Sequence, residues 1–347
     1  MLIRPGNAQH IGSRNEQQDS FAFSRIEDAS LVRRAGVLAV LADGMGGLAM
    51  GREASDCTVK TILSSHARSQ PETPPTNILQ NAVKLANNDV LAMAQNAGVD
   101  GEVGSTLVAV IVKDNNLYWT SVGDSRIYLY RSGELVPLTT AQNYDTELLQ
   151  RVIDGTLSME EAQSHPDRAA LTNFIGNQDI RPADSNLKPF PISDGDWIIL
   201  CSDGLFGTLT DYEIKEELFG NPHDSCERLI KKVLSRNKPH QDNTTVTILT
   251  CGDRNSVTIR TKKKIRQHKI FTPEQKQKKF RWISILVALA FFVALTLAAY
   301  IFYKQAQKHL MEKPITIGEN IQKSQSGSSE VPISKGKANA ENENISD

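Results

Sequence analysis

The sequence predicts an α+β fold in which antiparallel β-sheets pack together and pairs of helices cover the outside. Three observations favour this fold. Apolar runs of strand length end in glycine-containing turns, two blocks of sequence carry apolar residues at helical spacing, and the middle of the chain alternates short β-rich runs with turn residues. With 347 residues of ordinary globular composition, the chain is long enough for one large domain or two modest ones.

The N-terminal block contains two predicted strands followed by two predicted helices. Residues 20–24 alternate polar and apolar types, and residues 37–42 form a continuous apolar run that is typical of a strand buried on both faces. Aliphatic residues at helical spacing predict helices over 53–66 and 77–96. Three prolines within 71–75 separate these helices.

Short β-rich runs joined by tight turns predict an antiparallel meander in the middle of the chain. Its strands are expected at residues 106–112, 117–122, 127–130 and 135–138. Residues 144–172 are predicted to be mostly helical or irregular and to form a surface excursion. The remaining predicted elements are a strand at 197–201, helices at 211–219 and 225–236, a strand at 241–250 and a last short strand at 257–260.

Charge is distributed unevenly along the chain. Residues 1–255 hold 23 Lys and Arg against 33 Asp and Glu, a balance of −10, whereas residues 256–303 hold 10 against 1, a balance of +9. The acidic first part argues against nucleic-acid binding by the folded domain and suits a carboxylate-rich cation site. The four cysteines are scattered without C-x-x-C spacing, so neither a zinc site nor a disulfide framework is predicted.

One apolar segment predicts a membrane anchor. Residues 282–303 are 22 positions without a charge, enough for a helix to cross the hydrocarbon layer, and Trp282 and Tyr303 suit its two interfaces. A buried core helix is the alternative, which the length and the basic flank disfavour. Lys and Arg number nine in residues 262–281 against four in residues 304–323, so the positive-inside bias predicts a cytosolic N-terminal domain.

Five aspartates stand at the ends of predicted strands or in the turns between them. Asp43 follows the buried apolar run and precedes a glycine-rich turn, Asp203 follows a second strand, and Asp242 precedes a third. Asp19 precedes another strand, and Asp124 lies between two strands of the meander. An ordinary turn is the simpler interpretation of any one of them. The ordered set is far more specific than any single member.

Carboxylate oxygens are the ligands that Mg²⁺ and Mn²⁺ prefer, and no histidine or cysteine lies in these turns, which disfavours zinc. Two such ions about 3.5–4 Å apart can activate a water and hold a phosphate oxygen for in-line attack. The sequence therefore predicts a site for Mn²⁺ or Mg²⁺.

Six short motifs follow one another within residues 7–252: Arg14 with Asp19, Asp43-Gly-Met-Gly-Gly47, Gly104-Ser-Thr106, Gly123-Asp-Ser-Arg126, Ser202-Asp-Gly204 and Gln241-Asp-Asn-Thr-Thr245. Their residue types and order resemble the signature of the bacterial metal-dependent type 2C protein serine/threonine phosphatases. The resemblance leaves the basic, apolar and polar C-terminal segments uncovered.

The resemblance implies an antiparallel β-sandwich flanked by helix pairs (αββα), with a site for two metal ions at one edge. The implied metal ligands are Asp43, which would bridge both ions, the backbone carbonyl of Gly44, Asp203, Asp242, Asp19 through a water, and Asp124 at a possible third ion. Arg14 would bind the substrate phosphate, because a guanidinium fork suits a phosphate dianion. A weak surface ion pair is the simpler interpretation of Arg14.

The sequence departs from the family pattern at Gln17-Gln18 and, relative to animal members, at Met45. Gln17 and Gln18 stand where the family usually has Asn-Glu or Asn-Gln, so a charge near the metals would be missing and metal affinity would fall more than activity. Met45 stands where animal relatives carry a histidine suggested as general acid, and a thioether cannot donate a proton. Bacterial members commonly have methionine there, so a metal-bound water would protonate the leaving alkoxide. His165 belongs to a sequence similar to the family's flap motif and is expected to be structural.

The sequence thus predicts a membrane-anchored, metal-dependent phosphatase that hydrolyses phosphoserine and phosphothreonine by attack of a metal-activated water. Phosphoproteins would be its substrates and a serine/threonine kinase its partner. The alternative is a catalytically impaired phosphatase-like scaffold that binds phosphoproteins. The expected location is the bacterial inner membrane, with a single span and a cytoplasmic catalytic domain. The predicted parts are a catalytic domain (1–255), a basic juxtamembrane linker (256–281), a transmembrane helix (282–303) and a disordered polar tail (304–347).

Overall fold

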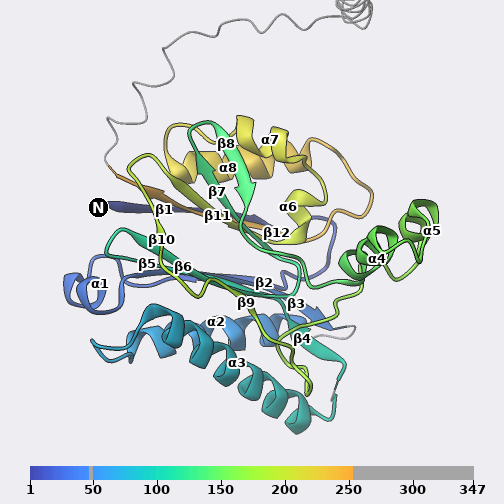
Figure 1. The fold of residues 1–347 in the computed structure, drawn as a ribbon, viewed down its shortest axis with the longest axis horizontal. Helices are drawn as coiled ribbons and strands as arrows, with labels where there is room; N and C mark the ends of the chain where they lie inside the picture. Colours follow the sequence, from blue (N-terminus) through green and yellow to red (C-terminus); the bar gives the residue numbers. More distant parts are fainter. Residues whose placement is uncertain (47–49, 100, 253–347) are drawn as a thin grey trace, which may run out of the picture. The chain divides into compact units, whose positions relative to one another are not determined.

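The computed structural model describes residues 1–46, 50–99 and 101–252. All of them belong to the unit Met1–Ile265. Within the described part, two β-sheets lie face to face and helices cover their outer faces (Figure 1). The predicted α+β class with packed antiparallel sheets is therefore confirmed.

The first sheet has the strand order β1, β12, β11, β7, β8, and every neighbouring pair is antiparallel. Its strands are β1 (Ile3–His10), β12 (Thr244–Cys251), β11 (Trp197–Cys201), β7 (Arg126–Arg131) and β8 (Glu134–Pro137). β1, from the start of the chain, pairs with β12, from the end of the described part, over eight residues. This pairing fixes the two ends of the domain against each other.

The second sheet has the order β10, β6, β5, β3, β2 and is also antiparallel. Its strands are β10 (Phe190–Pro191), β6 (Asn116–Val122), β5 (Leu107–Lys113), β3 (Val37–Gly46) and β2 (Asp19–Phe23). Two short strands extend it: β4 (Val103–Ser105) pairs with the end of β3, and β9 (Asp184–Ser185) pairs with β6. The predicted meander corresponds to β5 through β8, but it crosses between the sheets after β6.

An apolar layer fills the space between the two sheets. Leu41 and Val110 from the second sheet meet Ile198 and Leu249 from the first, and all four are fully buried. Strand β3 also packs against helices on its other face through Leu38. Because β3 is covered on both faces, its sequence is a continuous apolar run rather than an alternating one.

Helices cover the outer face of each sheet (Figure 1). The second sheet is covered by α2 (Gly51–Ala67) and α3 (Pro75–Ala97), and the first by α6 (Asp203–Phe206), α7 (Asp211–Glu216) and α8 (Pro222–Leu234). α3 begins at a proline, whose missing amide hydrogen costs nothing in the first turn, and ends where Gly98 adopts the left-handed conformation. The predicted helices at 53–66, 77–96, 211–219 and 225–236 are all present, although α7 is shorter than expected.

Six elements of the described part were not expected from the sequence: β1, α1 (Ala29–Ala35), α6 and the short strands β4, β9 and β10. β1 contains Pro5 and Gly6, which disfavour strands, but proline is tolerated because β1 lies at the edge of its sheet. Gly6 is required because an added Cβ would lie 2.4 Å from the backbone of α8. The glycine thus lets α8 pack directly on the strand.

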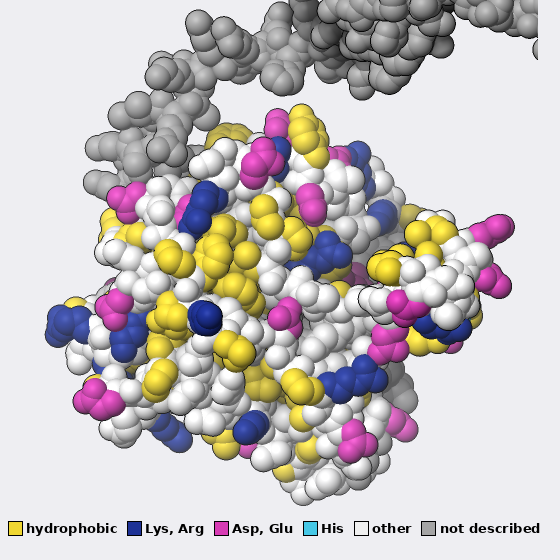
Figure 2. All heavy atoms as spheres, in the orientation of Figure 1, with side chains coloured by type: hydrophobic (Ala, Val, Ile, Leu, Met, Phe, Trp, Pro, Cys, Tyr) yellow, Lys and Arg dark blue, Asp and Glu magenta, His cyan; other side chains and the backbone are white. Residues whose placement is uncertain are grey.

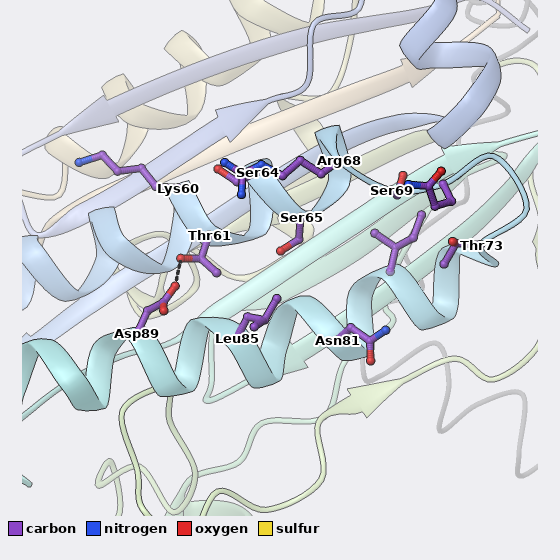
Figure 3. Close-up of a pocket in the computed structure, with 12 residues that line it drawn as sticks. Lys60, Thr61, Ser64, Ser65, Arg68, Ser69, Thr73, Asn81, Leu85 and Asp89 are labelled. Atoms are coloured by element: carbon purple, nitrogen blue, oxygen red, sulfur yellow. Dashed lines mark hydrogen bonds between the residues drawn. The ribbon is translucent and has the colours of Figure 1, made fainter.

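A groove of about 610 Å³ lies between α2 and α3 (Figure 3). Its lining combines small polar side chains, such as Ser64 and Ser65, with longer polar side chains and the apolar Leu85. Thr61 Oγ1 donates a hydrogen bond of 2.6 Å to Asp89 Oδ2 within it. None of the five predicted metal-binding aspartates lines this groove, so it is separate from the proposed chemistry.

The predicted membrane segment at 282–303 and the predicted strand at 257–260 lie outside the described residues. Among the helices between residues 1 and 252, the structure shows none that is both long enough and apolar enough to span a bilayer.

Candidate metal centre

The five predicted metal-binding aspartates come from both sheets. Asp19 begins β2 and lies opposite Asp43 of β3 in the antiparallel register. Asp203 begins α6 directly after β11, Asp242 lies two residues before β12, and Asp124 lies in the turn that leads from β6 to β7. The negative charges of the other four all act on the carboxyl group of Asp43. The fold therefore gathers side chains that are up to 223 positions apart in the sequence, from 19 to 242.

Asp19 connects the two sheets at this site. Its Oδ2 accepts hydrogen bonds from Ser202 Oγ at 2.8 Å and from Thr245 Oγ1 at 2.7 Å, both from the first sheet's side of the site. The side chain is buried, and its Oδ1 has no hydrogen-bond partner in the described part of the chain. Burial raises the pKa of Asp19 to about 6, although the two hydroxyl groups act in the opposite direction.

Mutual repulsion and burial act on the other carboxyl groups. Burial, and then the charge of Asp19, raise the pKa of Asp43 well above its ordinary value, even though part of the residue reaches solvent. Burial, followed by the charges of Asp124 and Asp242, raises the pKa of Asp203 to about 7. Burial also raises the pKa of Asp124. These carboxyl groups are held together at a cost in electrostatic energy.

This donor set fits a hard divalent cation. The Oδ1 atoms of Asp19 and Asp203 are both buried and without a hydrogen-bond partner in the described part of the chain. Buried carboxylate oxygens that repel one another are stabilised when a cation binds between them, and oxygen ligands suit Mg²⁺ and Mn²⁺. Within residues 1–46, 50–99 and 101–252, however, no three acidic, imidazole or thiol side chains are already arranged around a common point as a finished metal cage.

An ion pair between Arg14 and Asp242 accounts for part of this incomplete arrangement. Arg14 Nη2 donates to Oδ2 of Asp242 at 2.6 Å, so the predicted phosphate-binding residue is paired with a predicted metal ligand. The hydrogen bond with Asp242 raises the pKa of Arg14. The Arg14 side chain is 56% exposed, which leaves the rest of its guanidinium free to meet a ligand from solvent.

Residues of two further motifs hold Asp43 in place. The backbone N–H of Asp43 donates to Thr106 Oγ1 at 3.0 Å, and its carbonyl accepts from Thr106 N at 2.8 Å and from Ser105 Oγ at 3.1 Å. Thr106 Oγ1 in turn shares a hydrogen bond of 2.7 Å with Ser125 Oγ, next to Asp124. Both motifs could be recognised in the sequence, but no role was predicted for their hydroxyl groups. They position the backbone of two predicted ligands.

Gly44 is required by close packing of two backbones. A Cβ at this position would lie 1.9 Å from the carbonyl oxygen of Gly51, at the start of α2. The N–H of Gly44 donates to Gln18 O at 3.1 Å, which pairs β3 with the segment before β2. The predicted ligand Gly44 therefore lies where β3, α2 and the Gln18 segment meet.

Asn243 holds the loop that carries Arg14. Its Nδ2 donates to Ile11 O at 2.8 Å and to Glu16 O at 3.0 Å, and its Oδ1 accepts from the N–H of Gln18 at 2.7 Å. Gln17 and Gln18, which depart from the family pattern, are thus part of a loop anchored beside Asp242. The anchoring uses backbone groups of the loop and does not depend on a charged side chain at either position.

The excursion between β8 and β9 is attached to the turn that carries Asp124. It contains α4 (Tyr144–Ile153) and α5 (Met159–Ser164), which project from the body of the domain, with hydrophobic side chains on their surface (Figures 1 and 2). Gln142 N donates to Gly123 O at 2.9 Å, and a hydrogen bond from Asn143 lowers the pKa of Asp124 against the effect of burial. The predicted surface excursion is confirmed.

His165 lies in this excursion and has a structural setting. Its ring packs edge-on against Tyr144 at 5.0 Å between centroids, and its Nδ1 accepts a hydrogen bond of 3.2 Å from the N–H of Asp167. These contacts agree with the structural role expected from the sequence.

The fold and the site together define a class of protein: an αββα sandwich with a cluster of aspartates contributed by both sheets. Residues 7–249 match the family model for protein phosphatase 2C, and the chain belongs to this family.

Named relatives and a solved structure agree with this assignment. The chain is 33% identical over 216 residues to the serine/threonine protein phosphatase PstP of Mycobacterium tuberculosis, a match that covers 61% of this chain but only 40% of PstP. It is 30% identical over 228 residues to the protein phosphatase PhpP of Streptococcus pneumoniae, covering 64% of this chain and 89% of PhpP. A structure of the PstP catalytic domain in complex with two manganese ions has a TM-score of 0.58 and 30% identity, covering 72% of this chain and 99% of that one.

Proposed function

We propose that this chain is a metal-dependent protein serine/threonine phosphatase that hydrolyses phosphoserine and phosphothreonine in proteins. The observation that carries the proposal is the convergence of Asp19, Asp43, Asp124 and Asp203 in one electrostatically strained cluster, with Arg14 and Asp242 beside it. Membership of the protein phosphatase 2C family supports the same activity.

The aspartates would hold Mn²⁺ or Mg²⁺, as the donor set and the two manganese ions of the PstP structure suggest. Asp43 would bridge two ions, with Gly44, Asp203, Asp242 and Asp19 around them, and Asp124 would help to hold a third. Such ions supply Lewis acidity, which lowers the pKa of water and neutralises phosphate charge. The chain's own contribution is to keep the carboxylate oxygens within reach of one another.

Arg14 would bind the phosphate dianion of the substrate through its exposed guanidinium. To do so fully, it must leave Oδ2 of Asp242, which it contacts at 2.6 Å. Met45, beside Asp43, has no proton to transfer, so the leaving serine or threonine oxygen would take its proton from water.

The proposal includes a membrane anchor. The uncharged segment 282–303 and the excess of Lys and Arg in 262–281 support a single span with the phosphatase domain on the cytoplasmic side of a bacterial inner membrane. The basic linker would also be attracted to anionic lipid, unless its charge serves only to set the orientation. Substrates would be phosphoproteins, including those made by a partner serine/threonine kinase.

The test uses the full chain purified in mild detergent and a phosphothreonine peptide. Phosphate release is expected with Mn²⁺, and it should stop when a chelator is added. Asp43→Asn keeps the size of the side chain but removes its charge, and activity should fall by several orders of magnitude if bound metal supplies most of the rate. Activity that survives both chelator and Asp43→Asn would contradict the proposal.

The same preparation distinguishes the impaired scaffold suggested by Gln17 and Gln18. A scaffold would bind the phosphopeptide in calorimetry but release no phosphate at any Mn²⁺ concentration.

A further inference from the structure

The side chain of Gln241 lies beside the backbone segments that carry Asp203 and Asp242, two of the predicted metal ligands. Gln241 directly precedes Asp242 and is buried, with 6% of its surface exposed. Its Nε2 donates to Gly204 O at 3.2 Å, to Asp242 O at 3.3 Å and to Thr244 Oγ1 at 3.1 Å. Its Oε1 accepts from Thr208 Oγ1 at 2.9 Å. Both ends of the amide are therefore used.

These hydrogen bonds join segments that are distant in sequence. Gly204 and Thr208 belong to α6 and its C-terminal turn, which begins with Asp203, whereas Asp242 and Thr244 lead into β12. The two backbones touch beside the amide, because a Cβ at Gly204 would lie 2.0 Å from Asn243 O. A single side chain thus fixes the backbone next to Asp203 and the backbone of Asp242.

The backbone of Gln241 also reaches the loop that carries Arg14. Ser13 N donates to Gln241 O at 2.7 Å, and Gly12 approaches the same oxygen so closely that a Cβ there would lie 2.4 Å from it. The segment around Gln241 therefore meets both predicted metal ligands and the predicted phosphate-binding loop.

We infer that Gln241 is a positioning residue that sets the spacing between the carboxylates of Asp203 and Asp242, and through it the affinity of the site for a divalent cation. The inference rests on the proposed function, because only a metal site gives this spacing a chemical purpose. Neither carboxylate is held by the amide directly. Gln241 acts on the backbone from which each one projects, so its removal should loosen the ligand geometry while leaving all the ligands present.

A simpler role would be general stability, since any buried amide that loses its partners destabilises a fold. Asn186, which is half-buried, provides a control with a comparable set of hydrogen bonds. Its Oδ1 accepts from Trp119 N at 2.7 Å, and its Nδ2 donates to Leu117 O at 3.0 Å and to Lys188 O at 2.8 Å. It makes a similar set of bonds beside β6, β9 and β10 and contacts none of the aspartates through them.

The experiment measures Mn²⁺ binding by titration calorimetry on the full chain in detergent, without substrate. Gln241→Met keeps the length of the side chain and removes the amide, and we expect Mn²⁺ affinity to fall roughly 10- to 100-fold, the range usual for partners that orient metal ligands. Asn186→Leu should lower the thermal unfolding temperature in chelator but leave the affinity within about twofold of the wild type. Thr208→Val, which removes one bond only, should give a smaller loss of affinity and serves if Gln241→Met does not fold.

Phosphatase activity at saturating Mn²⁺ gives a second readout, because a residue that only positions ligands should allow most of kcat to return once the site is filled. Equal Mn²⁺ affinity in the wild type, Gln241→Met and Thr208→Val would overturn the inference, as would an equal loss in Asn186→Leu. A wild-type chain that binds no Mn²⁺ would overturn the proposed function itself, which is a different result.

Discussion

At the scale of single residues, the site is a set of carboxyl groups whose burial disfavours their charged form. Asp19 keeps one oxygen in two hydrogen bonds while its other oxygen has none in the described part of the chain, and Asp43 is repelled by four neighbours. Such a cluster lowers the stability of the domain and is retained where it serves a function. Two predictions follow from individual side chains.

The first concerns pH. The folded pKa values of Asp19, about 6, and Asp203, about 7, lie above the value of about 3.9 for an unfolded aspartate. The folded chain therefore binds more protons than the unfolded chain between about pH 4 and pH 7. In chelator, the contribution of these two groups to the free energy of unfolding should be highest near pH 4. It should fall as pH rises to 7.

Denaturant unfolding in chelator at a series of pH values measures this effect, with Asp203→Asn as the comparison. The variant should show a weaker fall between pH 5 and pH 7. An equal slope in both proteins would contradict the assignment of the pKa shift. Mn²⁺ should reverse the trend, since binding requires deprotonated ligands and improves as pH rises.

The second concerns Arg14. Loss of charge-assisted hydrogen bonds to a phosphate costs about 1.5–3 kcal/mol, so Arg14→Ala should lower kcat/KM for a phosphothreonine peptide roughly 10- to 100-fold. Mn²⁺ affinity should not fall, because the substitution frees Asp242 from its ion pair. Arg25→Ala, an exposed arginine beyond the opposite end of β2, is the control and should behave as the wild type. Reduced Mn²⁺ affinity in Arg14→Ala would mean that the ion pair supports the metal site rather than competing with it.

At the scale of elements, the sequence predicted the long helices, the buried strands and the antiparallel pairs β5–β6 and β7–β8, but not how the other strands pair. The apolar run of β3 and the helical spacing of α2 and α3 are local signals, and each was read with boundaries within a few residues. β1 was missed because Pro5 and Gly6 disfavour a strand, and only the packing of α8 explains the glycine. Between β6 and β7 the chain crosses from the second sheet to the first. This crossing depends on long-range contacts that no local sequence pattern predicts.

The same limit applies to the site. All five aspartates and Arg14 could be singled out because the strand-end turns and the family motifs contain them, and the structure places them near one another, while their roles stay predictions. The roles of Thr106, Ser202 and Gln241 could not be read in advance, because a hydrogen bond between Ser202 and Asp19 joins positions 183 residues apart. A sequence motif shows that such residues belong together but not which atom each one contacts.

A prediction at this scale concerns the contact between β3 and α2. Gly44→Ala would place a Cβ 1.9 Å from Gly51 O, so one of the two backbones must move. We expect a loss of about 2–4 kcal/mol in the free energy of unfolding, together with weaker Mn²⁺ binding, because Asp43 is the adjacent residue. Gly98→Ala is the comparison: Gly98 has a φ of +71° but open space around it, so it should cost only about 1 kcal/mol. Because Gly44 has no positive φ, equal losses would show that the backbones of β3 and α2 move apart at little cost and that their close contact does not decide the effect.

At the scale of the whole molecule, the prediction that matters is the membrane anchor. The segment 282–303 carries no charge over 22 residues, and the nine Lys and Arg in 262–281 should hold its N-terminal side in the cytoplasm. The full chain, expressed in bacteria, should therefore sediment with membranes and resist extraction by alkaline carbonate. A chain that ends at residue 281 should be released.

A charge substitution tests the anchor without shortening the chain. Val293→Lys places an ammonium near the middle of the span, where it costs about 2.5–3.5 kcal/mol in insertion, whereas Val331→Lys makes the same change in the polar tail. Val293→Lys should shift a measurable part of the protein to the carbonate-soluble fraction, and Val331→Lys should not. Phosphatase activity towards a soluble peptide should be the same in both variants, because neither residue belongs to the domain that carries the aspartates. If both variants and the wild type partition alike into the soluble fraction, the segment is not an anchor, and the basic linker must serve some other purpose.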